Sequence, residues 1–162
     1  MTDHVAAATV DIKAVINGVE WEGEVSAGQT LLEFLRSTMG LIGVKRSCEA
    51  LVCGACTVLI DGNPVSSCSC LAFEIHGRAV ATVESLADQG RLDLLQRAFI
   101  EKGAVQCGFC TPGQLMMAKA LLAATPDPTV EEIRTWMSGN ICRCGCYPNI
   151  VAAIRSVIKG ES

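Results

Sequence analysis

The 162-residue chain has few aromatic side chains, no basic block and no long hydrophobic run. Its seven aromatic residues (two Trp, one Tyr and four Phe) give little support for stacking on nucleic-acid bases. The net charge is −4 with every thiol protonated, and no cluster of Lys or Arg marks a surface for DNA, RNA or an anionic membrane. No apolar run approaches the about 20 residues of a transmembrane helix. The sequence therefore indicates neither a nucleic-acid partner nor a transmembrane segment.

The N-terminal stretch also lacks the features of a secretory signal. It contains Asp3 and Asp11 and has no long apolar core. We therefore expect a cytoplasmic protein, and in the cytoplasm thiols stay reduced. The ten cysteines are then expected to be metal ligands rather than disulfides. Export of a folded complex on a partner's signal is the alternative that stays open.

The first half of the chain has the pattern of a small sheet with one helix. Strand signals occupy residues 10–16, 19–25, 56–60 and 79–83. The dipeptide Asn17-Gly18 between the first two strands is typical of a hairpin turn. Thr30 and Glu33 form a capping box before a short helix, which we expect to end at Gly40. A twisted sheet packed on this helix is the natural assembly.

The second half has helical spacing throughout. Helices are expected over residues 92–100, 112–124, the segment that follows a capping box of Thr129 and Glu132, and 148–158. The sequence therefore predicts an α+β protein with two domains. The first, α+β domain covers residues 1–84, and the second, all-α domain covers residues 85–162.

The first cysteine set has the spacing of a plant-type ferredoxin. Cys48, Cys53 and Cys56 follow the pattern C-x4-C-x2-C, and Cys68 comes after eleven intervening residues. A [2Fe–2S] cluster needs four thiolates on a compact core, together with backbone N–H donors that stabilise its negative charge. Gly54 lets the backbone approach that closely. A structural zinc site matches poorly, because zinc sites favour paired C-x2-C arms.

The second cysteine set consists of two separated pairs. Cys107 and Cys110 form C-G-F-C, Cys142 and Cys144 form C-R-C, and 31 residues lie between the pairs. Each pair precedes a predicted helix, whose positive N-terminal potential stabilises thiolates. Two antiparallel helices with adjacent ends would bring both pairs to one point. Four thiolates allow zinc or [2Fe–2S], and the spacing leaves both open, although C-x-C is awkward for a zinc ribbon.

Two cysteines are left over by these sets. Cys70 lies two residues after Cys68, and we interpret it as a small buried hydrophobic side chain. Cys146 extends the second set to C-R-C-G-C. We interpret Cys146 as spare too, because the four-ligand set is complete without it.

Three segments, in this order, resemble the iron–sulfur subunit of the xanthine oxidase family of molybdenum hydroxylases. They are residues 48–68, residues 106–113 (QCGFCTPG) and residues 139–144 (GNICRC). The resemblance covers about residues 10–158. It implies a plant-type ferredoxin-like (β-grasp) N-terminal domain and a four-helix C-terminal domain, each holding one [2Fe–2S] cluster. Bacterial members often comprise three chains, so it also implies a small subunit beside a large molybdenum subunit and a medium FAD subunit, in a dimer of heterotrimers.

The resemblance also implies roles for individual residues. Cys48, Cys53, Cys56 and Cys68 would hold the cluster nearer FAD, whereas Cys107, Cys110, Cys142 and Cys144 would hold the cluster nearer molybdenum. Gln106 and the Cys144 sulfur match positions that touch the pterin of the molybdopterin cytosine dinucleotide in the large subunit. Ser47 and Leu51 stand where the family commonly has glycine, or serine in the second case, and either position could require a positive φ.

The sequence therefore predicts an electron-transfer subunit of a molybdenum-dependent oxidoreductase. It would relay electrons from the molybdopterin centre through two [2Fe–2S] clusters to FAD or an external acceptor, while substrate chemistry belongs to the large subunit. The alternatives are a free-standing ferredoxin with a zinc-stabilised helical domain and a redox-sensing regulator. Metal content separates the electron-transfer subunit, with four irons and no zinc, from the free-standing ferredoxin, with two irons and zinc. The family handles purines, N-heteroaromatics, aldehydes and carbon monoxide, so the resemblance names no substrate.

Overall fold

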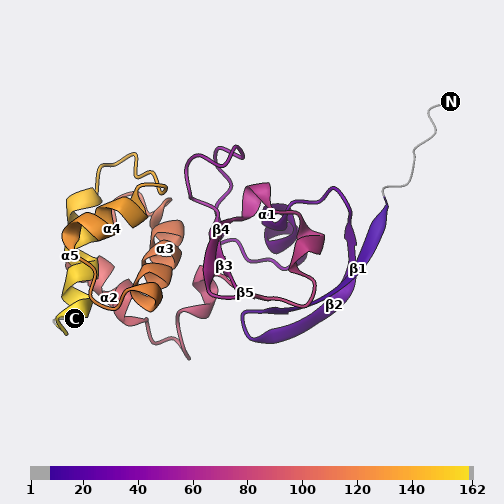
Figure 1. Cartoon of the computed structure of the whole chain (residues 1–162), viewed down its shortest axis with the longest axis horizontal. Coiled ribbons are helices and arrows are strands. Elements are labelled where there is room, and N and C mark those ends of the chain that lie inside the picture. Colours follow the sequence, from indigo (N-terminus) through magenta and orange to yellow (C-terminus); the bar gives the residue numbers. More distant parts are fainter. Residues whose placement is uncertain (1–7, 161–162) are drawn as a thin grey trace.

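The computed structural model describes residues 8–160 as an elongated molecule with a sheet at one end and helices at the other (Figure 1). Residues 1–7 of the stretch weighed as a secretory signal lie outside the described residues. Within residues 8–160, no helix has both the length and the apolar character needed to cross a membrane.

A five-stranded mixed sheet occupies the first half. Its strands are β1 (Thr9–Ile16), β2 (Val19–Ser26), β3 (Thr57–Ile60), β4 (Asn63–Ser66) and β5 (Ala79–Ala81), in the spatial order β2-β1-β5-β3-β4. The predicted hairpin is confirmed, because Asn17 and Gly18 both have positive φ between the antiparallel strands β1 and β2. The short strand β4 was not predicted. It contains Pro64 and lies at the sheet edge, where proline is tolerated.

One short helix packs its apolar side chains into the core of the sheet half. Helix α1 (Leu31–Glu33) starts where Thr30 Oγ1 accepts the Glu33 N–H, and it continues as a π-helical segment, η1 (Phe34–Thr38). The buried Phe34 ring meets the Trp21 ring edge-on, with 4.8 Å between centroids. Three 3-10 turns complete this half: η2 (Ser67–Ser69), η3 (Ala72–Ile75) and η4 (Val83–Ser85). The strand predicted through Val83 therefore ends earlier, at Ala81.

The second half is helical, as predicted. Its helices are α2 (Leu94–Glu101), α3 (Thr111–Ala124), α4 (Val130–Met137) and α5 (Tyr147–Ile158). The capping box of Thr129 and Glu132 forms in both directions, at 2.7 and 3.2 Å. Helix α2 has a capping box that was not predicted: Asp93 caps its start, so the helix begins two residues after the expected Leu92.

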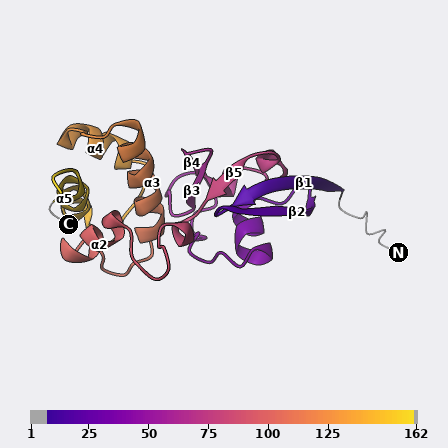
Figure 2. The ribbon, with the colours of Figure 1, turned by 90° about the horizontal axis from the view of Figure 1, so that it is seen from below.

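Each half has its own hydrophobic core. The first core draws its buried residues from 12–80 and the second from 95–154. A third, small cluster of Leu59, Met116 and Ala120 joins them, because α3 packs against β3 and β4 (Figure 2). The predicted division into domains at residues 84 and 85 stays a prediction.

Candidate metal centres

The first cysteine set gathers where a loop enters the sheet. Cys48 and Cys53 lie on the loop before β3, Cys56 directly precedes that strand, and Cys68 lies in the turn after β4. Antiparallel pairing of β3 with β4 brings the two strand ends together, and with them Cys56 and Cys68. The Cys48 and Cys53 thiols lie within hydrogen-bonding reach of each other, as do those of Cys56 and Cys68. The structure therefore gathers the four thiols as two pairs.

Backbone N–H groups surround the exposed end of this set. The N–H groups of Ala50 and Val52 donate to the Cys48 thiol, and the Ala50 nitrogen lies 3.5 Å from its sulfur. These donors, together with Cys53, lower the pKa of Cys48 to about 6. Burial acts in the opposite direction at Cys56 and raises its pKa to about 11. The loop therefore supplies the N–H donors that a negatively charged sulfur requires.

The backbone conformation of this loop distinguishes Ser47 from Leu51, the two positions at which the sequence left a positive φ open. Leu51 has a positive φ of 59°, whereas Ser47 is not among the positive-φ residues. The position of Leu51 is therefore the one at which a glycine would relieve left-handed backbone strain. Its side chain is 64% exposed, so packing of the side chain does not compensate for that strain.

The second cysteine set lies where two helices begin. Cys110 occupies the N-cap position of α3, and Cys142 and Cys144 lie on the loop before α5. That loop lies on the same side of the molecule as the first cysteine loop (Figure 1). The Cys107 thiol lies within hydrogen-bonding reach of Cys144, and the Cys110 thiol within reach of Cys142. Four thiols again form two pairs, although they come from segments far apart in the sequence.

Nearby hydrogen-bond donors and burial shift the pKa values of the thiols in this set in opposite directions. The Phe109 N–H and the Cys144 thiol lower the pKa of Cys107, whereas burial raises the pKa of Cys110 to about 12. Burial also opposes ionisation of Cys142, but N–H donors, with Cys146 first, outweigh it and lower the pKa of that thiol. Hydrogen bonds thus lower the pKa of one thiol in the first set, Cys48, and of two in the second, Cys107 and Cys142.

The two spare cysteines have different surroundings. Cys70 is half-buried beside Glu74, and burial raises its pKa to about 11. Cys146 is fully buried against the second set, with its N–H 3.4 Å from the Cys142 sulfur and its thiol within hydrogen-bonding reach of that sulfur. The run C-R-C-G-C places Cys146 beside the second set, but counting four ligands does not indicate that it contacts Cys142.

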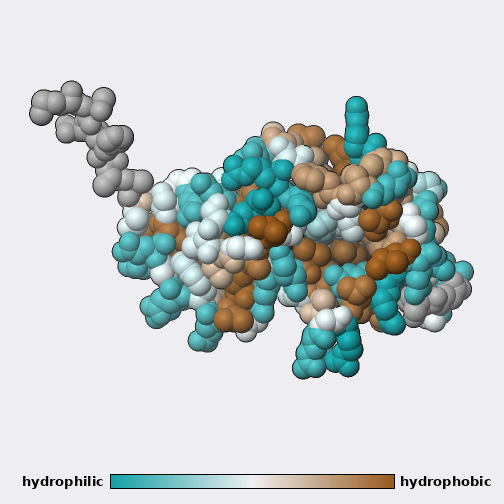
Figure 3. All heavy atoms as spheres, turned by 180° about the vertical axis from the view of Figure 1, so that it is seen from behind, coloured by the Kyte–Doolittle hydropathy of each residue, from teal (hydrophilic) through white to brown (hydrophobic). Residues whose placement is uncertain are grey.

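The two positions matched to a pterin contact, Gln106 and Cys144, are both exposed. The neighbouring large apolar side chains Phe109 and Ile141 are 46% and 42% exposed. In the view from behind, hydrophobic side chains gather over the middle of the molecule and the helical half, between hydrophilic groups (Figure 3). Phe109 and Ile141 make the surface beside the second set suited to contact with another protein.

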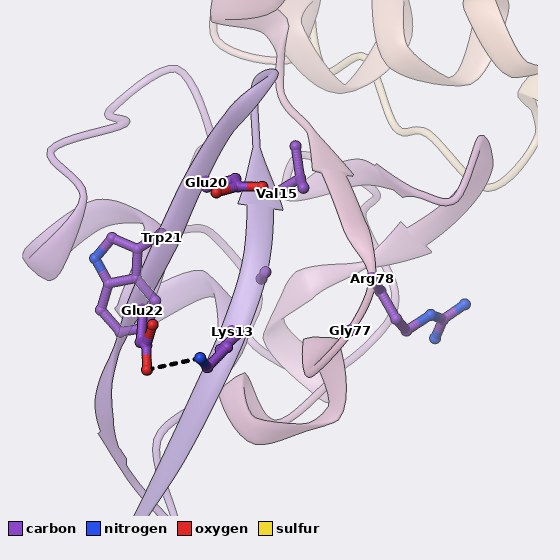
Figure 4. Close-up of a pocket in the computed structure, with 8 residues that line it drawn as sticks. Lys13, Val15, Glu20, Trp21, Glu22, Gly77 and Arg78 are labelled. Atoms are coloured by element: carbon purple, nitrogen blue, oxygen red, sulfur yellow. Dashed lines mark ion pairs between the residues drawn. The ribbon is translucent and has the colours of Figure 1, made fainter.

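A hollow of about 470 Å³ lies away from both cysteine sets, on the edge strand β2 and its neighbour β1 (Figure 4). The ion pair of Lys13 and Glu22, at 3.0 Å, crosses it, and Arg78 stands on its other side. No cysteine is among its lining residues. The hollow is therefore separate from the candidate metal centres.

The thiol arrangement fits a dinuclear cluster. Each set presents two pairs of thiols. A [2Fe–2S] cluster uses four thiolates, two on each iron. The donor chemistry and the N–H groups around Cys48 agree with that cluster type.

Comparison with known proteins agrees with this donor chemistry. A family described as "2Fe-2S iron-sulfur cluster binding domain" matches residues 14–87, and one described as "[2Fe-2S] binding domain" matches residues 82–155. The nicotinate dehydrogenase small FeS subunit of Eubacterium barkeri is 45% identical, over 93% of this chain and 96% of that one. The xanthine dehydrogenase iron–sulfur-binding subunit of Escherichia coli O157:H7 is 43% identical, over 90% and 92%.

A solved structure extends the likeness to the fold. Quinoline 2-oxidoreductase from Pseudomonas putida 86 contains a chain that superposes with a TM-score of 0.87 at 41% identity, covering 95% of this chain and 99% of that one. The similarity therefore spans both cysteine sets and nearly the whole length of both proteins. On these grounds the chain belongs to the small iron–sulfur subunits of the xanthine oxidase family of molybdenum hydroxylases.

Proposed function

We propose that the chain is an electron-transfer subunit, which relays electrons from the molybdopterin centre of a partner through two [2Fe–2S] clusters to FAD or an external acceptor. The gathering of eight thiols into two sets of two pairs is the observation that carries this proposal. The two relatives described above are subunits of dehydrogenases, which supports a role in an oxidoreductase complex. Membership of such complexes favours a subunit over a free-standing ferredoxin.

Eight cysteines are the proposed ligands. Cys48, Cys53, Cys56 and Cys68 hold one cluster in a ferredoxin-like domain of residues 1–84, and Cys107, Cys110, Cys142 and Cys144 hold the other in a four-helix domain of residues 85–162. When bound, the clusters supply one-electron chemistry, and the protein tunes it through hydrogen bonds, burial and charge. The N–H groups aimed at Cys48 are donors of that kind.

The proposed partners are those that family membership implies, and the exposed residues near the second set are consistent with one of them. Gln106 and Cys144 would face the pterin of a molybdopterin cytosine dinucleotide in a large subunit, with Phe109 and Ile141 in the same contact. A medium FAD subunit would cover the first set, and the whole would form a dimer of heterotrimers. Substrate chemistry belongs to the large subunit, and no residue of this chain is proposed to be catalytic.

Metal analysis tests the proposal directly. The purified protein should contain about four irons and four sulfides, and reduction should produce two distinct [2Fe–2S] paramagnetic signals. Identification of the chains that co-purify should reveal a molybdenum-bearing subunit. Stoichiometric zinc with half the iron, or a fully functional monomer without a molybdenum partner, would contradict the proposal.

Substitution of Gln106 tests the proposed pterin contact. Because Gln106 is exposed, Gln106→Ala should leave iron content and folding unchanged. Reduction of the clusters by substrate should slow more than their reoxidation, because only the first process crosses that contact. Rapid-mixing absorbance measurements separate the two rates, and equal slowing of both would argue against the contact.

A further inference from the structure

A buried polar contact joins the two cysteine loops across the middle of the molecule. The Asn140 side-chain amide donates to the Gly54 carbonyl at 2.9 Å and to Thr57 Oγ1 at 3.2 Å. Asn140 and Thr57 are 2% and 4% exposed. Gly54 directly follows Cys53, and Asn140 stands two residues before Cys142. One side chain thus holds the backbone between two proposed ligands of one cluster beside the backbone that leads into the other.

A main-chain hydrogen bond runs beside this contact. The Ile141 N–H donates to the Cys53 carbonyl at 2.9 Å. Ile141 directly precedes Cys142, so a single hydrogen bond, with covalent chain on either side, connects a proposed ligand of one cluster with a proposed ligand of the other. Any shift of the Asn140 segment would stretch this bond.

Helix α3 packs against this contact and adds a further hydrogen bond to it. The Gln114 side-chain amide donates to the Asn140 carbonyl at 2.7 Å. A Cβ at Gly113 would overlap the Gly54 carbonyl, and a Cβ at Gly54 would meet the Gly139 carbonyl at 2.6 Å. The backbones therefore approach as closely as they do only because positions 54 and 113 lack side chains.

Two polar atoms at this contact are left unpaired among residues 8–160. Asn140 Oδ1 and Gln114 Oε1 are buried and have no hydrogen-bond partner there. Burying an unpaired acceptor costs free energy of folding, so an apolar side chain would fill the same space with less destabilisation than an amide does. The side-chain amide nitrogen of Asn140, which makes both of its hydrogen bonds across the contact, explains the presence of this residue better than packing does.

We infer that Asn140 is a positioning residue that fixes the spacing and mutual orientation of the two cysteine sets. It contacts no proposed ligand itself and acts through the Gly54 carbonyl and the Ile141 N–H. The inference rests on the proposed function, because it needs a cluster at each set. Electron tunnelling falls steeply with distance, so a fixed spacing keeps exchange between the clusters fast and uniform.

The test is Asn140→Ala in the full chain, in the complex in which the chain purifies. Loss of the amide donors should speed hydrogen exchange at the Ile141 N–H by about tenfold. After reduction with dithionite, the magnetic splitting between the two clusters should change, while about four irons are retained. Asn149→Ala is the matched control: Asn149 donates to the Lys102 carbonyl at 2.8 Å within the helical half, so both readouts should equal those of the unmodified protein.

The outcomes are distinguishable. Unchanged exchange at Ile141, unchanged splitting or loss of one cluster in Asn140→Ala would overturn the inference. Failure of the unmodified protein to hold two clusters would instead overturn the proposed function. If Asn140→Ala does not fold, Thr57→Val removes one acceptor of the amide at nearly constant volume, together with the 2.7 Å hydrogen bond that the Thr57 hydroxyl donates to the Gly54 carbonyl. Exchange at Ile141 should then rise by about threefold, and no rise would refute the positioning role.

Discussion

The two cysteine sets reach the same arrangement, two pairs of thiols, by different routes. Three cysteines of the first set lie within residues 48–56, and one strand pair brings in Cys68. The second set joins the starts of α3 and α5, so it depends on how the whole helical half packs. Local backbone geometry therefore defines the first candidate centre, whereas tertiary packing defines the second. Substitutions that act on one dependency and not on the other should separate the two centres.

The largest effect should come from removing one thiolate of either set. Cys53→Ser and Cys110→Ser should each lower the iron content from about four to about two and abolish one paramagnetic signal. The other signal should persist, because the two sets share no proposed ligand. Iron analysis and low-temperature EPR measure both quantities, and loss of both clusters in either variant would contradict two independent centres.

Core substitutions should distinguish the two sets by stability. Phe99 and Phe34 are 1% and 0% exposed in the helical and sheet cores. Phe99→Ala should cost about 3–5 kcal/mol of folding free energy and release the second cluster first as denaturant rises. Phe34→Ala is the matched control and should release the first cluster first. Simultaneous release in both variants would show that the halves unfold as one unit.

The spare thiols should have a smaller effect. Cys70→Ser and Cys146→Ser should both retain about four irons and both signals. Cys146 is the sharper case, because its N–H and thiol both contact the Cys142 sulfur. If Cys146→Ser loses iron and Cys70→Ser does not, Cys146 is a cluster ligand in place of a neighbouring proposed one.

The smallest effect should come from relieving the backbone at Leu51. Leu51→Gly should stabilise the first cysteine loop by about 1 kcal/mol, because glycine adopts the left-handed conformation without a Cβ penalty. The measurement is the rate at which a chelator removes iron from the first cluster, which should fall. Ser47→Gly is the control and should bring no gain, since Ser47 lacks a positive φ.

Local patterns predicted much of the fold. The hairpin at Asn17-Gly18 and the helix start at Thr129 are confirmed, because each depends on residues within a few positions of one another. The edge strand β4 escaped prediction, since its short, proline-containing segment has no clear alternation. Sequence also left two positions open for a positive φ, and only the folded loop selects Leu51.

The contacts between the halves were beyond prediction for a physical reason. Asn140 and Gly54 are 86 positions apart, and no periodicity or spacing connects them. The sequence grouped Cys107 with Cys110 and Cys142 with Cys144, because metal-ligand spacing is a short-range pattern. The structure instead pairs the Cys107 thiol with Cys144 and the Cys110 thiol with Cys142, and that exchange depends on tertiary packing. The run C-R-C-G-C placed Cys146 near the second set, but its contact with the Cys142 sulfur was not predicted, since spacing does not say which thiol a fifth cysteine meets.

The absence of side chains at Gly54 and Gly113 limits which halves of related proteins can be joined in one hybrid chain. Each half has its own hydrophobic core, which suggests modules that could be exchanged between relatives. A hybrid chain would nevertheless need a residue without a side chain on the α3 surface and an amide donor at the place of Asn140. A helical half that lacks either would displace the Gly54 carbonyl or leave it without its donor. The halves are therefore exchangeable only as a matched pair of surfaces.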